Sequence, residues 1–278
     1  MSTQTTAPLL SIEGLSVTMP TPAGLTELVR DTDIVIGDGE IVGLAGESGS
    51  GKTMTASAVM GILPPGARAT GRIMFEGRNL LELRRKELDA VRGNRIAIVF
   101  QDPTAALHPL LRIGTQITEH LIAHTGVSKK QADARAVELL ELVRITDPKS
   151  AVKAYPHQFS GGMRQRAAIA IALACEPRVL IADEPTTALD VTVQAGILRL
   201  FDRLARETGV SMLFITHDLG VMSSIADRTY VFKDGSVVES GVTSLILNDP
   251  QHEYTRALID ARAQSLAPKA GEQAGGAR

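Results

Sequence analysis

The chain has 278 residues, of which 44% are hydrophobic and 3% aromatic, and its formal net charge is −2. This length fits one large domain or a domain with an embedded subdomain, with enough apolar residues for a sizeable core. The near-neutral charge gives no general reason to bind nucleic acid or anionic lipid, so we expect no nucleic-acid partner. The single cysteine, Cys175, excludes an internal disulfide and a multi-cysteine metal cluster.

We expect neither a secretory signal nor a membrane-spanning helix. The first ten residues are polar and lack Lys and Arg, unlike a signal peptide. The best candidate for a span, 167–175, has nine residues, whereas a transmembrane helix needs about 20. Any membrane role is therefore expected to come through partners.

The sequence of the N-terminal third predicts short antiparallel strands in addition to one buried strand. Short apolar runs at 12–17, 33–36 and 71–75 are separated by Gly and Pro, which favours antiparallel additions. Four other runs are nearly continuous in apolar residues, as in parallel strands covered on both faces. These four runs are 41–45, 95–100, 179–182 and 211–215. Helical patterns between them predict an α/β fold with a mainly parallel sheet.

Residues from about 102 to 165 predict a helical subdomain inserted between sheet strands. The segments 114–125 and 128–143 have mainly helical patterns, the second with Ser128 as its N-cap. After Gly241 we expect a C-terminal extension of two short helices with Pro250 between them, ending near residue 262. Residues 263–278 contain much Ala and Gly, and we expect a disordered tail there after an ordered domain spanning 1–262.

Polar side chains follow each of the four buried runs. The segments that carry them begin at Gly46, Gln101, Asp183–Glu184 and Thr216–His217. Ligands of open parallel sheets bind outside the carboxyl ends of the strands. The sequence therefore predicts that four separate segments deliver polar groups to one site.

The loop after the first run has the complete P-loop pattern between a predicted strand and a predicted helix. Its residues are Gly46, Glu47, Ser48, Gly49, Ser50, Gly51, Lys52 and Thr53. The glycines let backbone N–H groups turn toward phosphate oxygens, and the helix N-terminus adds a favourable dipole. Lys52 can reach the β- and γ-phosphates, and the Thr53 hydroxyl can join the shell of a Mg²⁺ ion. The alternative, an exposed lysine in a Gly-rich turn, leaves this complete pattern unexplained.

Two adjacent acids end the third buried run. We expect Asp183 to hold Mg²⁺, directly or through water, and Glu184 to polarise the attacking water. Taken alone, the two side chains could equally be solvated loop carboxylates. Their combination with the P-loop favours ATP hydrolysis.

The segment 159–166, Phe-Ser-Gly-Gly-Met-Arg-Gln-Arg, resembles the signature sequence of ABC ATPases, with Phe159 where Leu is commoner. Ser160 is a good N-cap, Gly161 and Gly162 allow close approach of a ligand, and free backbone N–H groups suit a phosphate. The P-loop and the two acids leave kinases, GTPases, helicases and motor ATPases open. The segment 159–166 favours ABC ATPases over these other classes. The resemblance to ABC ATPases covers roughly residues 9 to 262.

The resemblance implies a P-loop NTPase (RecA-like) core and two ATP molecules sandwiched between two ATPase copies. In that arrangement Ser160, Gly161 and Gly162 of one copy face the γ-phosphate held by the other. The resemblance further implies that Gln101 is a Q-loop glutamine that senses Mg²⁺ and water. Asp190 would belong to a D-loop at the dimer interface, and His217 would be a switch histidine that contacts the γ-phosphate.

Four stretches are similar to the ATPases of oligopeptide and dipeptide importers, a group that includes nickel-chelate, sugar and glutathione systems. They are 101–103, 184–192, 216–221 and 249–258. The resemblance implies an ATPase coupled to uptake of peptides or a similar small solute, peripheral on the cytoplasmic face of the cell membrane. The implied partners are two transmembrane permease subunits, a second ATPase (related or identical) and, indirectly, an extracytoplasmic substrate-binding protein.

The sequence departs from that group in two places. Many members carry a cysteine-rich extension that holds an iron–sulfur cluster; this chain has only Cys175, and we expect no such cluster. Many also place an aromatic residue against adenine, where this chain has Met19, whose thioether can still pack on a base. His120 and His124 have the spacing of metal ligands, but without a third ligand we expect a surface or packing role.

Three alternative functions explain part of the sequence. A soluble ABC ATPase of DNA repair or translation control usually has a coiled-coil insertion or two fused ATPase domains, and neither pattern is present. A P-loop small-molecule kinase leaves 160–166 and His217 without a function. An inactive regulatory subunit conflicts with intact Lys52, Asp183 and Glu184.

Overall fold

A six-stranded sheet forms the centre of the fold, in the order β10-β9-β3-β8-β7-β6. The structure is a computed structural model that describes residues 7–22, 24–187 and 189–266. From one edge to the other, the strands are β10 (Ser236–Val242), β9 (Arg228–Lys233), β3 (Ile41–Ala45), β8 (Ser211–Thr216), β7 (Val179–Asp183) and β6 (Ile96–Val99). Strands β9 to β6 pair in parallel, and β10 is antiparallel to β9. The predicted α/β class and the four parallel strands are confirmed.

The hairpin β9–β10 was not predicted from the sequence. The apolar run of β9 is only Tyr230–Val231–Phe232, bounded by charged and polar residues, and β10 contains Gly241. The overlooked signal is the dipeptide Asp234-Gly235, whose φ values of 48° and 87° are both positive. A two-residue type I′ turn requires this conformation, and Asp-Gly favours it.

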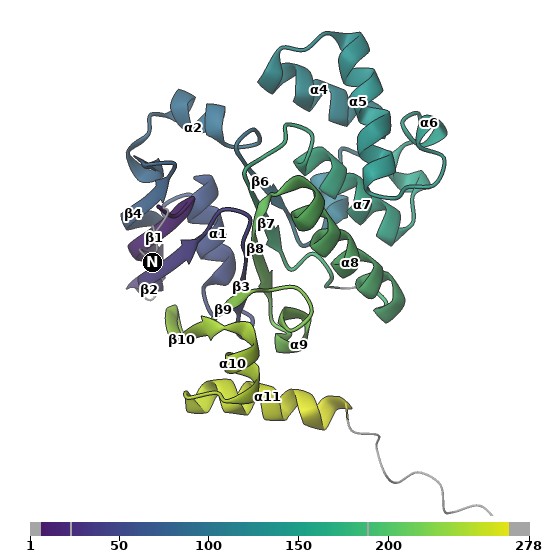
Figure 1. Ribbon diagram of the computed structural model, residues 1–278. Coiled ribbons are helices and arrows are strands. Elements are labelled where there is room, and N and C mark those ends of the chain that lie inside the picture. Colours follow the sequence, from purple (N-terminus) through teal and green to yellow (C-terminus); the bar gives the residue numbers. More distant parts are fainter. Residues whose placement is uncertain (1–6, 23, 188, 267–278) are drawn as a thin grey trace, which may run out of the picture.

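A second, antiparallel sheet confirms the predicted N-terminal additions. It contains β1 (Leu10–Thr21), β2 (Gly24–Ile36), β4 (Arg68–Phe75) and β5 (Arg78–Asn79) in the order β2-β1-β4-β5. Its buried residues join those of helix α1 (Lys52–Met60) and of the central sheet in one cluster. Figure 1 shows α1 between the two sheets, so the helix that follows the P-loop is fixed from both sides.

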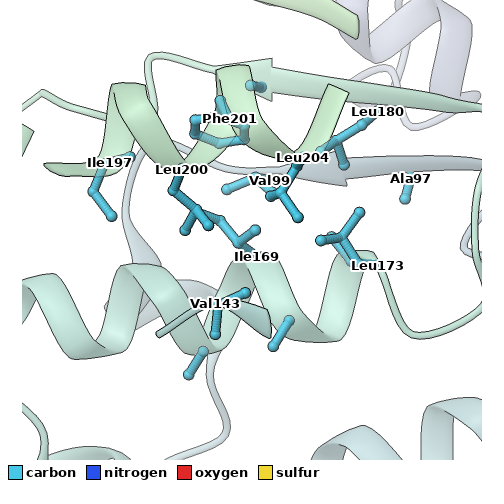
Figure 2. Close-up of a cluster of buried hydrophobic side chains, with 14 of the residues drawn as sticks. Ala97, Val99, Val143, Ile169, Leu173, Leu180, Ile197, Leu200, Phe201 and Leu204 are labelled. Carbon is cyan, nitrogen blue, oxygen red and sulfur yellow. The ribbon is translucent and has the colours of Figure 1, made fainter. Parts of the chain in front are cut away.

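The other face of the central sheet is covered by α7 (Gly161–Ala172) and α8 (Val191–Thr208). In Figure 2, Ile169 of α7, Leu173 directly after that helix, and Leu200 and Leu204 of α8 lie in one cluster with Val99 of β6. All of them are fully or almost fully buried. This packing holds α7 and α8 against the sheet, and the signature-like segment and Asp190 lie at the starts of these two helices.

Helices form the segment between β6 and α7, as predicted. They are α3 (Pro103–Ala106), α4 (Ile113–Thr125), α5 (Lys129–Leu142), α6 (Pro148–Ala151) and η2 (Pro156–Gln158). Ser128 is the N-cap of α5, as expected: its hydroxyl accepts from the N–H of Gln131, whose side chain accepts from the N–H of Ser128. Figure 1 shows α4, α5 and α6 projecting beyond the sheet.

The remaining helices connect strands or extend the C-terminal end. They are η1 (Leu80–Glu82), α2 (Arg85–Val91), α9 (Leu219–Met222), α10 (Thr243–Asn248) and α11 (Glu253–Leu266). The two expected helices around Pro250 are α10 and α11, and α11 includes residues 263–266, where we expected the tail to begin. The rest of that segment, 267–278, lies outside the described residues. In the described part of the chain, no helix has the length and apolar character needed to cross a bilayer.

Candidate functional site

Four neighbouring strands end at one edge of the central sheet. Because β3, β8, β7 and β6 are adjacent and parallel, their last residues align: Ala45 with Thr216, Asp183 with Ile215, and Val99 with Ala182. The polar groups that follow these strands therefore lie side by side. This is the convergence that the sequence predicted.

The P-loop, residues 46–53, has a backbone path that only glycine fits at two points. Gly46 has a φ of 149°, and a side chain there would collide with the carbonyl oxygen of Phe232. Gly51 has a φ of 110°, and a Cβ atom would lie 2.7 Å from the carbonyl oxygen of Leu28. Both are positive φ values that side-chain-bearing residues rarely adopt. The loop is thus closely packed between β2 and β9.

Lys52 is only 4% exposed and folds back over the loop. Its Nζ donates to the carbonyl oxygens of Gly46 and Glu47 at 2.7 Å each, and to Ser50 Oγ at 3.3 Å. Burial lowers the pKa of this ammonium group, and the negative charges of Glu184 and Asp183 act in the opposite direction. A buried cation whose hydrogen-bond partners are neutral oxygens suits an incoming phosphate.

Thr53 and Asp183 form a second pair beside the lysine. The Thr53 hydroxyl donates to Asp183 Oδ1 at 3.2 Å, and Asp183 is only 5% exposed. Burial raises the pKa of Asp183, while the hydrogen bond from Thr53 opposes that change. Both side chains offer oxygen, the donor type that Mg²⁺ prefers, so the pair fits a Mg²⁺ site.

Three polar side chains surround the Oε2 atom of Glu184, and two of them, Gln101 and Thr187, donate hydrogen bonds to it. Gln101 Nε2 lies at 3.2 Å, Thr187 Oγ1 at 2.9 Å and His217 Nδ1 at 3.3 Å. Glu184 has a φ of 45°, and its N–H donates to the carbonyl oxygen of Ile215 at 3.0 Å. An unusual backbone conformation and three side-chain contacts therefore fix this carboxylate.

Thr187 is a site residue to which the sequence analysis gave no role. It lies three positions after Glu184 and donates both to its carboxylate and, through its N–H, to its carbonyl oxygen. Thr at this spacing is a common partner in turns. The sequence signal that could have indicated this role is the pair Thr186-Thr187, which directly follows Glu184-Pro185.

Ser160, Gly161, Gly162 and Asp190 lie together at the starts of two helices. Ser160 Oγ accepts from the N–H of Met163 at 3.3 Å, and Asp190 Oδ1 accepts from the N–H of Val193 at 2.9 Å. A Cβ atom on Gly162 would lie 2.7 Å from Val193 Cγ1, which brings the two N-termini into contact. Ser160 and Gly161 are exposed. The atoms nearest Gly161 and Gly162 belong to Leu189 and Val193, whereas those nearest Gly51 of the P-loop belong to Leu28, Val29 and Gly235.

Met19 lies on β1 of the antiparallel sheet, and the two histidines lie on α4. Met19 is half-buried in β1 and pairs with Thr26 of β2, the strand that later reaches the P-loop at Leu28. His120 Nε2 lies 2.9 Å from the carbonyl oxygen of Gly93, and its ring centroid is 4.7 Å from that of His124. The histidines therefore pack α4 onto the turn that precedes β6.

Comparison with known proteins shows close relatives over most of the chain. The family described as ABC transporter matches residues 29–187. The oligopeptide transport ATP-binding protein OppD of Bacillus subtilis is 48% identical over 253 residues, 90% of this chain and 71% of that protein. The probable D,D-dipeptide transport ATP-binding protein DdpD of Escherichia coli is 44% identical over 266 residues, 95% of this chain and 81% of the relative.

A solved structure shares the fold. It is the dimeric structure of MJ0796, a bacterial ABC transporter cassette, with a TM-score of 0.75 and 28% sequence identity. The match covers 84% of this chain and 98% of the cassette. A second dimeric structure of that cassette, in a post-hydrolysis state bound to ADP and Pi, matches with the same TM-score of 0.75.

Proposed function

The chain is an ATP-binding subunit of the ABC transporter family, and from this premise we propose that it hydrolyses ATP to drive peptide import through partner subunits. The observation that carries the proposal is the arrangement at the sheet edge. There a buried lysine, a Thr–Asp pair and a fixed carboxylate follow neighbouring strands. Phosphoryl transfer requires these groups for phosphate binding, cation binding and placement of water.

The P-loop supplies the phosphate site. Backbone N–H groups of 46–53 and the N-terminus of α1 face the bound phosphates, and Lys52 exchanges its carbonyl partners for phosphate oxygens. Thr53, Asp183 and the amide oxygen of Gln101 are the residues that would hold Mg²⁺, which neutralises phosphate charge when bound. Met19, in the β1–β2 hairpin, packs against the adenine base through its thioether.

Glu184 is the catalytic base in this proposal. Its carboxylate orients the attacking water and accepts a proton from it as the water oxygen bonds the γ-phosphorus in line, while the bond from that phosphorus to the ADP oxygen breaks and ADP leaves. Gln101 donates to Oε2 and His217 Nδ1 lies 3.3 Å from it, and the two side chains keep the carboxylate directed at the γ-phosphate side of the site. His217 is 52% exposed, which leaves it accessible to the γ-phosphate. Positioning and charge stabilisation thus supply most of the rate acceleration.

A second ATPase copy completes the site. Ser160, Gly161 and Gly162 form an exposed helix N-terminus whose N–H groups suit the γ-phosphate bound by another copy. Asp190, at the adjoining start of α8, lies in the same interface. The matching MJ0796 cassette is a dimer, which supports this arrangement.

The transported solute is proposed from the relatives. The relatives OppD and DdpD are an oligopeptide transport ATP-binding protein and a probable D,D-dipeptide transport ATP-binding protein. We assign peptides to this chain, with two permease subunits, a second ATPase and an extracytoplasmic substrate-binding protein as partners. The chain then works at the cytoplasmic face of the cell membrane, bound there through the permeases.

Affinity purification of the tagged chain from detergent-solubilised native membranes tests the assembly. Mass spectrometry is expected to recover two multi-span proteins and a second ATPase, and the associated binding protein indicates the cargo. Recovery of soluble or DNA-repair proteins alone, under conditions that preserve known membrane complexes, would overturn the importer proposal. The ATP chemistry would stand in that case.

A further inference from the structure

Tyr254 connects the C-terminal helix to the P-loop. It is the second residue of α11 and is only 9% exposed. Its hydroxyl accepts a hydrogen bond from the N–H of Glu47 at 3.2 Å, across 207 positions of sequence. Tyr254 lies outside residues 29–187, the part matched by the family. A residue of the C-terminal extension thus contacts the nucleotide loop directly.

The backbone of Glu47 is held at both of its polar groups. Its N–H donates to Tyr254, and its carbonyl oxygen accepts from Lys52 Nζ at 2.7 Å and from the N–H of Ser50 at 3.2 Å. When Lys52 turns to a phosphate, the carbonyl oxygen of Glu47 keeps its bond from Ser50, and the tyrosine hydroxyl is the group that holds the Glu47 N–H. Burial raises the pKa of Tyr254 above its ordinary value, which is already well above neutral, and the protonated hydroxyl can donate to the Glu47 carboxylate while accepting from the Glu47 N–H.

The tyrosine is anchored by the hairpin that also supports the loop. The Glu239 carboxylate of β10 accepts from the N–H groups of Gln251 and His252 at 2.7 and 3.1 Å, which fixes the start of α11. The ammonium group of Lys233, at the end of β9, lies 5.0 Å from the centre of the Tyr254 ring. The turn of the same hairpin reaches the P-loop through Gly235, whose N–H donates to the carbonyl oxygen of Ser50 at 2.9 Å.

We propose that Tyr254 is a positioning residue for nucleotide binding, which fixes the Glu47 peptide so that the amides of 48–53 are oriented before phosphate arrives. This rests on the proposed binding of ATP at the P-loop. Ordering a glycine-rich loop costs conformational entropy, and a loop that is already ordered binds its ligand more tightly. The C-terminal extension thereby raises the affinity of the chain for nucleotide.

The test removes one hydroxyl. Tyr254→Phe keeps the ring and its contact with Lys233 but leaves the Glu47 N–H without its acceptor. We expect the Kd for Mg²⁺ and the non-hydrolysable analogue AMP-PNP, measured by calorimetry on the full chain, to rise ~5–20-fold. In the assembled transporter, the KM for ATP is expected to rise similarly while kcat at saturating ATP stays within about twofold, because the reacting groups are unchanged.

Tyr230→Phe is the matched control. Tyr230 is 7% exposed, and its hydroxyl accepts from the N–H of Val35, so this substitution also removes a buried tyrosine acceptor from a backbone amide. Tyr230 lies in β9 and pairs with Leu44 of β3, and the amide that donates to it belongs to β2. The substitution therefore removes no hydrogen bond to Glu47. We expect Tyr230→Phe to lower the Tm without changing the Kd for AMP-PNP. Equal rises in Kd for both variants would show a general structural effect and overturn the proposal.

Lys52→Ala separates failure of this inference from failure of the proposed function. If the wild-type chain binds AMP-PNP, Lys52→Ala does not and Tyr254→Phe binds as tightly as wild type, only the role of Tyr254 is overturned. If Lys52→Ala binds like wild type, the assigned nucleotide site is wrong and the inference falls with it. Hydrogen exchange of the Glu47 amide tests the contact in the wild-type chain without nucleotide. If this amide exchanges as fast as it would in an unfolded chain, the proposed fixing of the Glu47 N–H by Tyr254 is wrong.

Discussion

His217 and Glu184 face each other across the ends of neighbouring strands, with 3.3 Å between Nδ1 and Oε2. The same oxygen accepts hydrogen bonds from Gln101, which follows β6, and from Thr187, which follows β7. One carboxylate oxygen is thus held by groups that arrive after three different strands. A carboxylate fixed this firmly suits a base that has to meet one water molecule in one orientation.

Replacing Glu184 by Gln removes the proton acceptor but keeps the shape of the side chain. We expect ATP hydrolysis to fall ~10²–10⁴-fold, the usual contribution of a general base. Nucleotide affinity is expected to stay near that of wild type, because Lys52 and the loop are unchanged. Phosphate release by the assembled transporter measures the first quantity, and Glu176→Gln, at an exposed glutamate, is the control. Turnover within threefold of wild type would remove Glu184 from the proposed role.

Thr187→Val tests whether the contacts to Glu184 position it. The substitution removes the hydroxyl that lies 2.9 Å from Oε2 and retains the branched shape. We expect kcat to fall ~10-fold with little change in the KM for ATP, since a hydrogen bond to a charged group contributes about 1.5–3 kcal/mol. Thr208→Val is the matched control, because that hydroxyl bonds the carbonyl oxygen of Leu204 within α8. A rise in KM at constant kcat would indicate a binding role instead.

Ser160→Arg tests the signature segment. A bulky cation at this exposed helix start blocks the approach of a nucleotide held by another copy. Hydrolysis by the assembled transporter is expected to fall more than ~10²-fold, the scale of losing an oxyanion-type donor set. Binding of AMP-PNP to the isolated chain is expected to stay unchanged. Ser128→Ala, which removes the serine N-cap of α5, controls for loss of a cap. Normal transport-coupled hydrolysis by Ser160→Arg would show that the segment does not face ATP.

Cys175 gives a pH-dependent test of the packing. Burial, with a further contribution from the charge of Glu176, raises the pKa of this thiol from 9.0 to about 11. Because the thiolate is the nucleophile, alkylation by iodoacetamide at pH 8 is expected to run ~100-fold slower in the folded chain than in urea. The unfolded chain loses this proton first as the pH rises from 9 toward 11, so the thiol also lowers the free energy of unfolding across that window. Equal alkylation rates in folded and unfolded chains would contradict the burial.

The sequence predicted the parts of the site that are encoded locally. Lys52 follows a strand within a glycine-rich pattern, and Asp183 ends a continuous apolar run, so their places at the sheet edge followed from parallel topology. The hairpin β9–β10 was missed because its apolar run is short and its turn signal is a single dipeptide. The contact between Tyr254 and Glu47 joins residues 207 positions apart. Side-chain contacts of this kind depend on how α11 packs, which no local pattern specifies.

Uptake of a labelled peptide by the purified transporter, reconstituted in vesicles with its binding protein and ATP, tests the central claim most directly. The account predicts ATP-dependent accumulation with the wild-type chain and none with Glu184→Gln in the same complex. Accumulation that continues with Glu184→Gln would contradict the proposed catalytic base. ATP hydrolysis that moves another solute, such as a nickel chelate or a sugar, and no peptide would contradict the assigned cargo.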